Sequence, residues 1–246
     1  MLKIALLSDV HSNLEALTQA LDWIQDNNVE RIMCLGDVVG YGADPNPCCD
    51  ILREVCDVTL MGNHDAAVIG NMDINYYYQE AKDAIFWTRQ KLTKENFEWL
   101  YSLPYTHHEP ENQASYFHAA PLQPSGFYYV VQTKDALAHT PVYDQLSTWN
   151  FVGHSHLLNQ FMIDETRAKD LTGHRLSAHP QRKFIVNVGS TGQPRDRDNR
   201  LCFGLFDTTN QSFEHIRLDY DIKTTASKIT RAGLHEKFAN RLFAGR

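Results

Sequence analysis

The sequence predicts an α/β fold in which two packed mixed β-sheets form a sandwich flanked by helices. In the first hundred residues, short apolar runs alternate with segments whose apolar residues recur at helical spacing. From about residue 104 onward, short strand-like runs dominate. The chain has 246 residues, of which 43% are hydrophobic, so we expect a single domain over residues 1–246 with a sizeable core.

The first half alternates strands and helices. The expected strands cover residues 2–7, 31–35 and 58–61, and each runs into small or turn-forming residues. The expected helices cover residues 14–27, 46–55, 76–91 and 95–101. Ser12 or Asn13 is the expected N-cap of the first of these helices, because short polar side chains accept hydrogen bonds from exposed backbone N–H groups.

The second half is richer in strands. They are expected at residues 104–109, 113–118, 149–153, 158–163, 182–188, 201–207 and 212–218. The polar segment 164–180 should form a hairpin excursion. Residues 222–246 should form one or two C-terminal helices, either docked or peripheral, and their sequence does not indicate a function.

Charge, hydropathy and cysteine content restrict the location and partners. A net charge of −7 argues against a nucleic-acid surface, which is usually basic. No apolar run approaches the roughly 20 residues that cross a bilayer, and the first one lacks the features of a signal peptide. The five cysteines show no CxxC spacing and are expected to be reduced thiols. We therefore expect a cytoplasmic protein without a membrane partner.

Residues able to bind metal ions follow five of the expected strands. In an α/β sheet, the carboxyl ends of neighbouring strands open onto one crevice, so side chains distant in sequence can converge there. The strand at residues 2–7 runs into Ser8-Asp9, and the strand at 31–35 runs into Gly36-Asp37. The candidate ligands at these strand ends are Asp9, His11, Asp37, Asn63, His118, His154 and His156.

These ligands mix carboxylate, imidazole and amide oxygen. Such a set suits manganese, iron, zinc, cobalt or nickel better than calcium, which takes oxygen ligands only. Seven ligands are too many for one tetrahedral site, but they suit two divalent ions that share a bridging carboxylate. Two cations roughly 3.5–4 Å apart can activate a bridging water, as hydroxide, for in-line attack on a phosphate ester. We expect two transition-metal ions, with manganese preferred, and a small phosphate ester as substrate.

The motifs differ in how specific they are. Asp-x-His and Gly-Asp occur readily in surface loops, whereas Gly62-Asn63-His64-Asp65 is fairly specific and Gly153-His154-Ser155-His156 is moderately so. Any one of these histidines taken alone is more often a hydrogen-bonded structural residue than a ligand. The order of all the motifs along one chain favours the metal site.

Taken together, these segments resemble the calcineurin-like metallophosphoesterases, from Leu2 to about residue 207. The resemblance is strongest to a small prokaryotic branch labelled diadenosine-tetraphosphatase-like or serine/threonine-phosphatase-related. It implies that one metal is held by Asp9, His11, Asp37 and His156, and the other by Asp37, Asn63, His118 and His154. It also implies that Asp37 bridges the ions and that His64 is the catalytic histidine, which stabilises the transition state and protonates the leaving oxygen.

The chain departs from the serine/threonine phosphatases at two places. Those enzymes follow the bridging aspartate with Val-Asp-Arg-Gly and place arginine before Gly-Asn-His. Here the residues are Val39-Gly40-Tyr41-Gly42 and Met61. Two phosphate-binding arginines and the aspartate that supports the catalytic histidine are therefore missing, which argues against phosphoprotein phosphatase activity. Asp65 is a candidate replacement support for His64.

Other residues are weaker candidates. Arg195 and Arg197 follow a turn at the end of the strand 182–188, and either is a substrate-binding guanidinium or a solvated loop charge. We favour substrate binding for Arg195 only. Tyr76, Tyr77 and Tyr78 are either base-stacking residues or partly core, and residues 121–129 either line the pocket or belong to the core.

Two function classes remain. The first is a dinuclear-metal phosphoesterase that acts on phosphate monoesters, diesters or nucleotide-like esters. The alternative is a non-catalytic protein-binding scaffold on the same fold, as in the retromer subunit that resembles this family. His64 and all seven ligand positions are filled, which a scaffold does not need, so catalysis is favoured. The physiological substrate, the native metal and the oligomeric state are not specified by the sequence.

Overall fold

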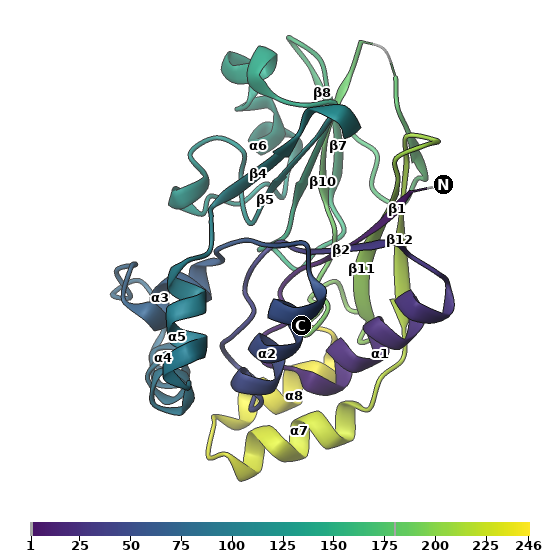
Figure 1. Cartoon of the computed structure of the whole chain (residues 1–246). Helices are drawn as coiled ribbons and strands as arrows, with labels where there is room; N and C mark the ends of the chain where they lie inside the picture. Colours follow the sequence, from purple (N-terminus) through teal and green to yellow (C-terminus); the bar gives the residue numbers. More distant parts are fainter. Residues whose placement is uncertain (1, 180) are drawn as a thin grey trace.

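The computed structural model describes residues 2–179 and 181–246 and contains two six-stranded mixed sheets with helices outside them (Figure 1). This arrangement confirms the predicted fold class. The first sheet has the spatial order β3 (Val58–Thr59), β2 (Arg31–Cys34), β1 (Lys3–Leu7), β11 (Leu201–Asp207), β12 (Ser212–Leu218) and β9 (Leu176–Ser177). The second has the order β4 (Thr106–Glu109), β5 (Ala114–Phe117), β6 (Trp149–Val152), β10 (Lys183–Asn187), β7 (Gln160–Ile163) and β8 (Ala168–Asp170).

The candidate ligands all follow parallel strands, namely β1, β2, β3, β5 and β6. In the first sheet β1, β2 and β3 run parallel, whereas β11 pairs antiparallel with β1. In the second sheet β5, β6 and β10 run parallel, whereas β4 and β7 are antiparallel to their neighbours. The carboxyl ends of the parallel strands therefore carry the loops that build the site.

Large apolar side chains fill the space between the sheets. Ile4 and Leu6 of β1 lie in one buried cluster with Trp149 and Phe151 of β6. The ring centres of Phe151 and Phe206 are 5.0 Å apart, so the two sheets contact each other directly. These residues alternate along their strands with residues on the opposite face, as a sandwich requires.

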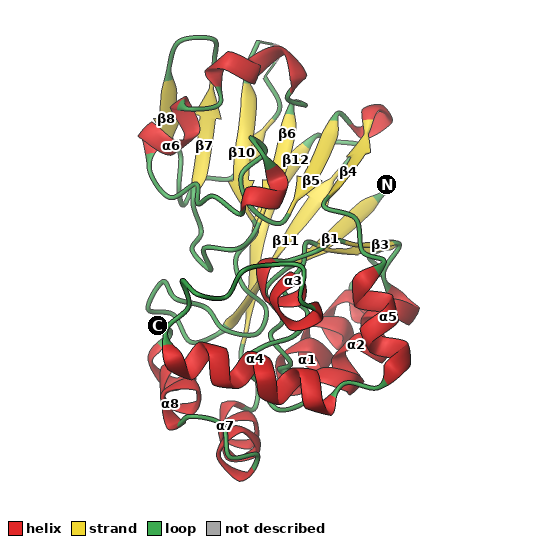
Figure 2. Ribbon diagram, turned by 90° about the vertical axis from the view of Figure 1, so that its left-hand side faces the viewer, coloured by secondary structure: helices red, strands yellow, loops and turns green. Residues whose placement is uncertain are grey.

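Most helices lie together below the strands in Figure 2, and residues of β1, β2 and β11 share a buried apolar cluster with them. They are α1 (Leu14–Asp26), α2 (Pro45–Val55), α3 (Asn63–Ile69), α4 (Gln79–Lys91) and α5 (Lys94–Tyr101), and a short helix α6 (Thr133–Leu137) lies beside the second sheet. The side chain of Asn13 accepts a hydrogen bond from Ala16 N at 3.1 Å, which confirms Asn13 as the N-cap of α1. No helix in residues 2–179 and 181–246 has the length and apolar character needed to cross a bilayer.

The C-terminal helices α7 (Ile222–Arg231) and α8 (Glu236–Ala244) are docked rather than peripheral. Phe238 and Leu242 of α8 are buried in a cluster that also contains Tyr41 and Ala84 of α4. Lys228 of α7 additionally forms an ion pair with Asp44 at 2.8 Å. The C-terminal segment therefore belongs to the same packed body as the site loops.

Several element predictions were wrong in detail. Helix α4 begins at Gln79, not at residue 76, and α3 and α6 were not predicted at all. The segment 164–180 does not form one hairpin: β8 pairs with β7 in the second sheet, and β9 pairs with β12 in the first. Pro180, the last residue of that prediction, lies outside the described residues. The pairing of β8 and β9 with strands of different sheets is tertiary, and local sequence pattern does not specify it.

The docking of α8 predicts unequal effects for two phenylalanines on the same helix. Phe238 is 0% exposed, whereas Phe243 is 49% exposed. Phe238→Ala should lower the free energy of unfolding by about 3–5 kcal/mol, because it opens a cavity in the cluster. Phe243→Ala should change it by less than about 0.5 kcal/mol. Urea titration of both variants checks this, and equally small effects would mean that α8 is not docked.

Candidate metal centre

Most of the candidate ligands lie in loops after the parallel strands, where their backbone angles are strained and hydrogen bonds between the loops stabilise them. Five of the seven candidates have positive φ angles without being glycine: Asp9, His11, Asp37, His154 and His156. Such angles are disfavoured for these residues and concentrate at functional sites. Backbone hydrogen bonds between the loops hold them, including Asp9 N to Gly36 O at 2.9 Å and His11 N to Asp37 O at 2.9 Å.

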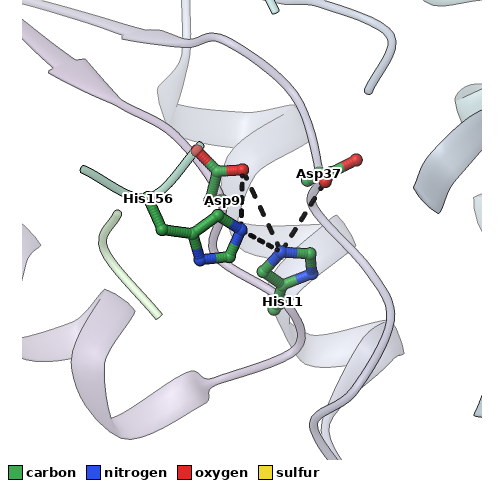
Figure 3. Close-up of side chains that lie close together, drawn as sticks. All are labelled: Asp9, His11, Asp37 and His156. Atoms are coloured by element: carbon green, nitrogen blue, oxygen red, sulfur yellow. Dashed lines mark hydrogen bonds and ion pairs between the residues drawn. The ribbon is translucent and has the colours of Figure 1, made fainter. Parts of the chain in front are cut away.

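The first group of ligands contains Asp9, His11, Asp37 and His156, which Figure 3 shows pointing toward one another. The Nε2 atoms of His11 and His156 are 3.2 Å apart. Asp9 Oδ1 lies 3.3 Å from His156 Nε2, and Asp37 Oδ2 lies 3.6 Å from His11 Nε2. All four residues are buried, and their ligand atoms lie within 4.8 Å of one another.

The second group contains Asp37, His118 and His154, and Asn63 adjoins it. His118 Nε2 lies 3.4 Å from Asp37 Oδ2 and 3.2 Å from the amide oxygen of Asn63. Asn63 donates its amide N–H to the hydroxyl of Tyr77, which leaves its oxygen directed at the group. The structure thus gathers all seven predicted ligands at one place.

Asp37 is the residue that the two groups share. Its Oδ1 accepts a hydrogen bond from the backbone N of His64 at 2.7 Å. Its Oδ2 is left between His11 Nε2, at 3.6 Å, and His118 Nε2, at 3.4 Å. A carboxylate oxygen in that position can bind two cations at once.

The remaining ring nitrogens of three histidines are bound to backbone carbonyls. His11 Nδ1 lies 3.1 Å from Val39 O, and His118 Nδ1 lies 2.9 Å from Leu35 O. His156 Nδ1 is bound to Gln193 O in the same way. A carbonyl oxygen can only accept a hydrogen bond, so each ring carries a proton on Nδ1, and its Nε2 faces the ligand group. This is the arrangement found in histidines that bind metals.

Among the candidate ligands, Asp9 Oδ1 and His154 Nε2 are buried and have no hydrogen-bond partner in the described residues. A buried polar atom without a partner is costly unless something satisfies it. Cations at the two groups would satisfy the carboxylate oxygens and the imidazole lone pairs together. The donor set and its geometry therefore fit two divalent metal ions.

Burial and neighbouring charges set the protonation states of the ligands in the metal-free site. Burial raises the pKa of Asp9 to about 7, with the negative charge of Asp37 adding to it. Burial lowers the pKa of His11 and of His156 well below the usual range, which keeps both rings neutral. Burial opposes the charge on His118, but Asp37 outweighs it and raises the pKa of His118 to about 9. Neutral imidazole and ionised carboxylate are the forms that bind metal, so His11 and His156 are ready to bind, whereas a metal would have to displace protons from His118 and Asp9.

His64 lies in the first turn of α3 and is 4% exposed. In the part of the chain that the structure describes, its Nδ1 has no hydrogen-bond partner, and a Cβ atom placed on Gly40 would lie 2.8 Å from it. Asp65 does not support it: that carboxylate accepts from Val39 N at 3.1 Å and from Gly62 N at 3.0 Å instead. Burial lowers the pKa of His64 to about 4, so the ring is neutral before an anion binds.

A cavity of about 440 Å³ opens onto the metal ligands and His64. Its aromatic and apolar lining consists of Tyr41, Met72, Tyr76, Tyr77, Tyr78, Phe127 and Tyr129. Residues 121–129 thus contribute part of the pocket wall, which was one of their two predicted positions, the other being the core. Tyr129 also stacks on His154, with ring centres 4.0 Å apart, and so helps to fix that ligand.

Two arginines complete the lining, and only one was a candidate. Arg195 lies in the cavity wall, whereas Arg197 is exposed and is not among the lining residues. Arg241 of α8 also lines the cavity, and the sequence analysis missed it. Nothing in the local pattern of α8 distinguishes Arg241 from an ordinary surface arginine, because only the docking of the helix brings it to the site.

Comparison with known proteins agrees with the site. Residues 2–211 match the model of the calcineurin-like phosphoesterase superfamily domain, a range that ends before α7 and α8. An uncharacterized protein of Methanocaldococcus jannaschii is 36% identical over 245 residues, which cover 99% of this chain and 98% of that protein.

Two solved structures are similar over their whole length. A metallophosphoesterase of Sphaerobacter thermophilus has 31% identity and a TM-score of 0.84, with 100% of this chain and 99% of that chain covered. A hypothetical protein of Pyrococcus horikoshii shares the fold at 20% identity, with a TM-score of 0.81 and the same coverage. The family predicted from the motifs is confirmed: the chain belongs to the calcineurin-like phosphoesterase superfamily.

Proposed function

We propose that the protein is a dinuclear-metal phosphoesterase that hydrolyses a small phosphate ester, with nucleotide-like esters among the candidates. The observation that carries this proposal is the position of Asp37 Oδ2 between His11 and His118, with the other ligand atoms buried around it. When bound, two divalent cations would supply an activated water and offset charge on the phosphoryl oxygens. Manganese is the preferred ion, with iron, zinc, cobalt and nickel as alternatives.

The protein residues have separate tasks in this proposal. His64 faces the cavity without being part of either ligand group, so it is free to donate a proton to the leaving oxygen. Its ring is neutral in the empty cavity, and a bound phosphate supplies the negative charge that favours protonation. Arg195 lies in the cavity wall, where its guanidinium can hold a phosphoryl oxygen.

The scaffold alternative is disfavoured by the same features. A protein-binding scaffold has no use for buried, strained ligands or for an unpartnered imidazole nitrogen facing a cavity. These features carry an energetic cost that a catalytic site explains and a binding surface does not.

The general proposal is tested with a panel of substrates. Manganese-loaded protein is assayed with p-nitrophenyl phosphate, bis-p-nitrophenyl phosphate, dinucleoside polyphosphates and cyclic nucleotides. Activity should disappear after chelation and return with Mn²⁺, Co²⁺ or Ni²⁺ but not with Ca²⁺, because the ligands include four imidazoles. Full activity in protein shown to contain no metal would contradict the proposal.

The shared position of Asp37 predicts how metal content responds to substitution. Asp37→Asn removes the charge that both ions use, so it should lose both metals. His156→Ala removes a ligand of the first group only and should lose mainly one metal. Metal analysis of the two purified variants checks the difference. Two metals and a near-normal rate in Asp37→Asn would show that Asp37 is not a bridge.

The role of His64 predicts a dependence on the leaving group. A nitrophenolate leaves with little help, whereas an alkoxide needs a proton, and a positioned acid contributes about 10²–10⁴-fold. His64→Ala should keep its metals, lose most activity on alkyl or nucleoside esters, and lose much less on p-nitrophenyl esters. Rates on both classes and metal content are measured together. An equal loss on both classes would contradict the acid role, and loss of metal would make His64 a structural residue.

A further inference from the structure

Two arginines from separate parts of the chain share one hydrogen-bond acceptor at the cavity wall. Arg195 lies in the loop after β10, and Arg241 lies near the end of α8. Arg195 Nη2 lies 2.8 Å from Gln193 Oε1, and Arg241 Nη1 lies 3.0 Å from the same oxygen. The two guanidinium groups are therefore held side by side.

The charge of this pair is not neutralised by the protein. Among the described residues, neither arginine has a carboxylate within 4.0 Å. The Nε atoms of both are buried and lack a hydrogen-bond partner. Each guanidinium carbon lies 5.7 Å from the ring centre of Tyr41, which stabilises a cation only weakly. Two adjacent positive charges with spare donors form a site for an anion.

Gln193 links this pair to the metal ligands. Its backbone carbonyl accepts the Nδ1 proton of His156, and its side chain holds the two arginines. The backbone N of Arg195 also donates to His156 O at 3.2 Å. The arginine pair is thus fixed relative to the ion that His156 would bind, and both arginines line the cavity that His64 and Asp37 line.

Hydrogen bonds hold the end of α8 against the loop after β10. Arg197 N donates to Gly245 O at 2.8 Å, and Asn199 donates its side-chain N–H to Phe243 O at 3.2 Å. These bonds join the end of α8 to the loop that carries Gln193 and Arg195. Helix α8 therefore supplies part of the active-site wall.

We propose that Arg195 and Arg241 form a phosphoryl-binding fork, positioned by Gln193, that makes the enzyme prefer phosphate monoesters to diesters. The inference rests on the proposed phosphoesterase function. A monoester carries a charge of about −1.5 to −2 at pH 7 and three free oxygens, which two guanidinium groups can bind. A diester has a single charge, and its second substituent replaces one of those oxygens.

The test compares two substrates with the same leaving group, p-nitrophenyl phosphate and bis-p-nitrophenyl phosphate. Arg241→Ala and Arg195→Ala should each lower kcat/KM on the monoester by about 10–100-fold and on the diester by less than about threefold. The double variant should lose less than the product of the single losses, because both side chains hold one group. Metal content should stay at the wild-type level.

Matched variants separate the fork from general damage. Arg241→Lys keeps the charge but not the planar donors, so it should recover only part of the loss. Arg231→Ala removes an exposed arginine of α7 that does not line the cavity and should match wild type on both substrates. Equal losses on the monoester and the diester, or no loss in Arg241→Ala, would overturn the fork.

A binding measurement separates failure of the fork from failure of the proposed function. Manganese-loaded protein is titrated with inorganic phosphate in a calorimeter, and Arg241→Ala should raise Kd by about tenfold or more. If wild type hydrolyses no ester but shows this difference, the fork stands and the hydrolysis proposal falls. If wild type hydrolyses esters and Arg241→Ala binds phosphate equally well, the fork falls and the hydrolysis proposal stands.

Discussion

The carboxylate of Asp37 is the group on which the rest of the site depends. One oxygen is held by the backbone of His64, at the start of α3, and the other lies between His11 and His118. The loops reach this point by adopting disfavoured backbone angles, and hydrogen bonds from ring Nδ1 atoms to backbone carbonyls turn the imidazoles inward. A Cβ atom on Gly62 would lie 2.1 Å from Asp37 N, so any side chain at position 62 would clash with the backbone of Asp37.

The ligand set was predictable from sequence because it follows a topological rule. Asp9, Asp37, Asn63, His118 and His154 each come soon after a strand, and parallel strands bring their carboxyl ends together. Other contacts at the site follow no such rule. Arg241 reaches the cavity only because α8 docks, and Tyr77 and Asp65 act through partners 14 and 26 to 27 positions away. Those contacts depend on tertiary packing, which one sequence does not reveal.

The structure shows what the residues at the positions that depart from the serine/threonine phosphatase pattern contact. Gly40 stands where those enzymes have the supporting aspartate, and His64 Nδ1 beside it is left without a partner. Tyr41 stands where they have an arginine, and its ring lies under the guanidinium groups of Arg195 and Arg241. Positive charge therefore reaches the cavity from the loop after β10 and from α8 rather than from the loop after β2.

We infer that Asp37 lies between two metal ions when the site is loaded, and the most direct test of this inference is to locate the ions. Crystals loaded with Mn²⁺ should give two anomalous-scattering peaks roughly 3.5–4 Å apart, the usual separation in two-metal sites. Asp37 Oδ2 should lie between the peaks, with His11 and His156 beside one and His118 and His154 beside the other. A single peak, or two peaks that do not share Asp37, would contradict this account.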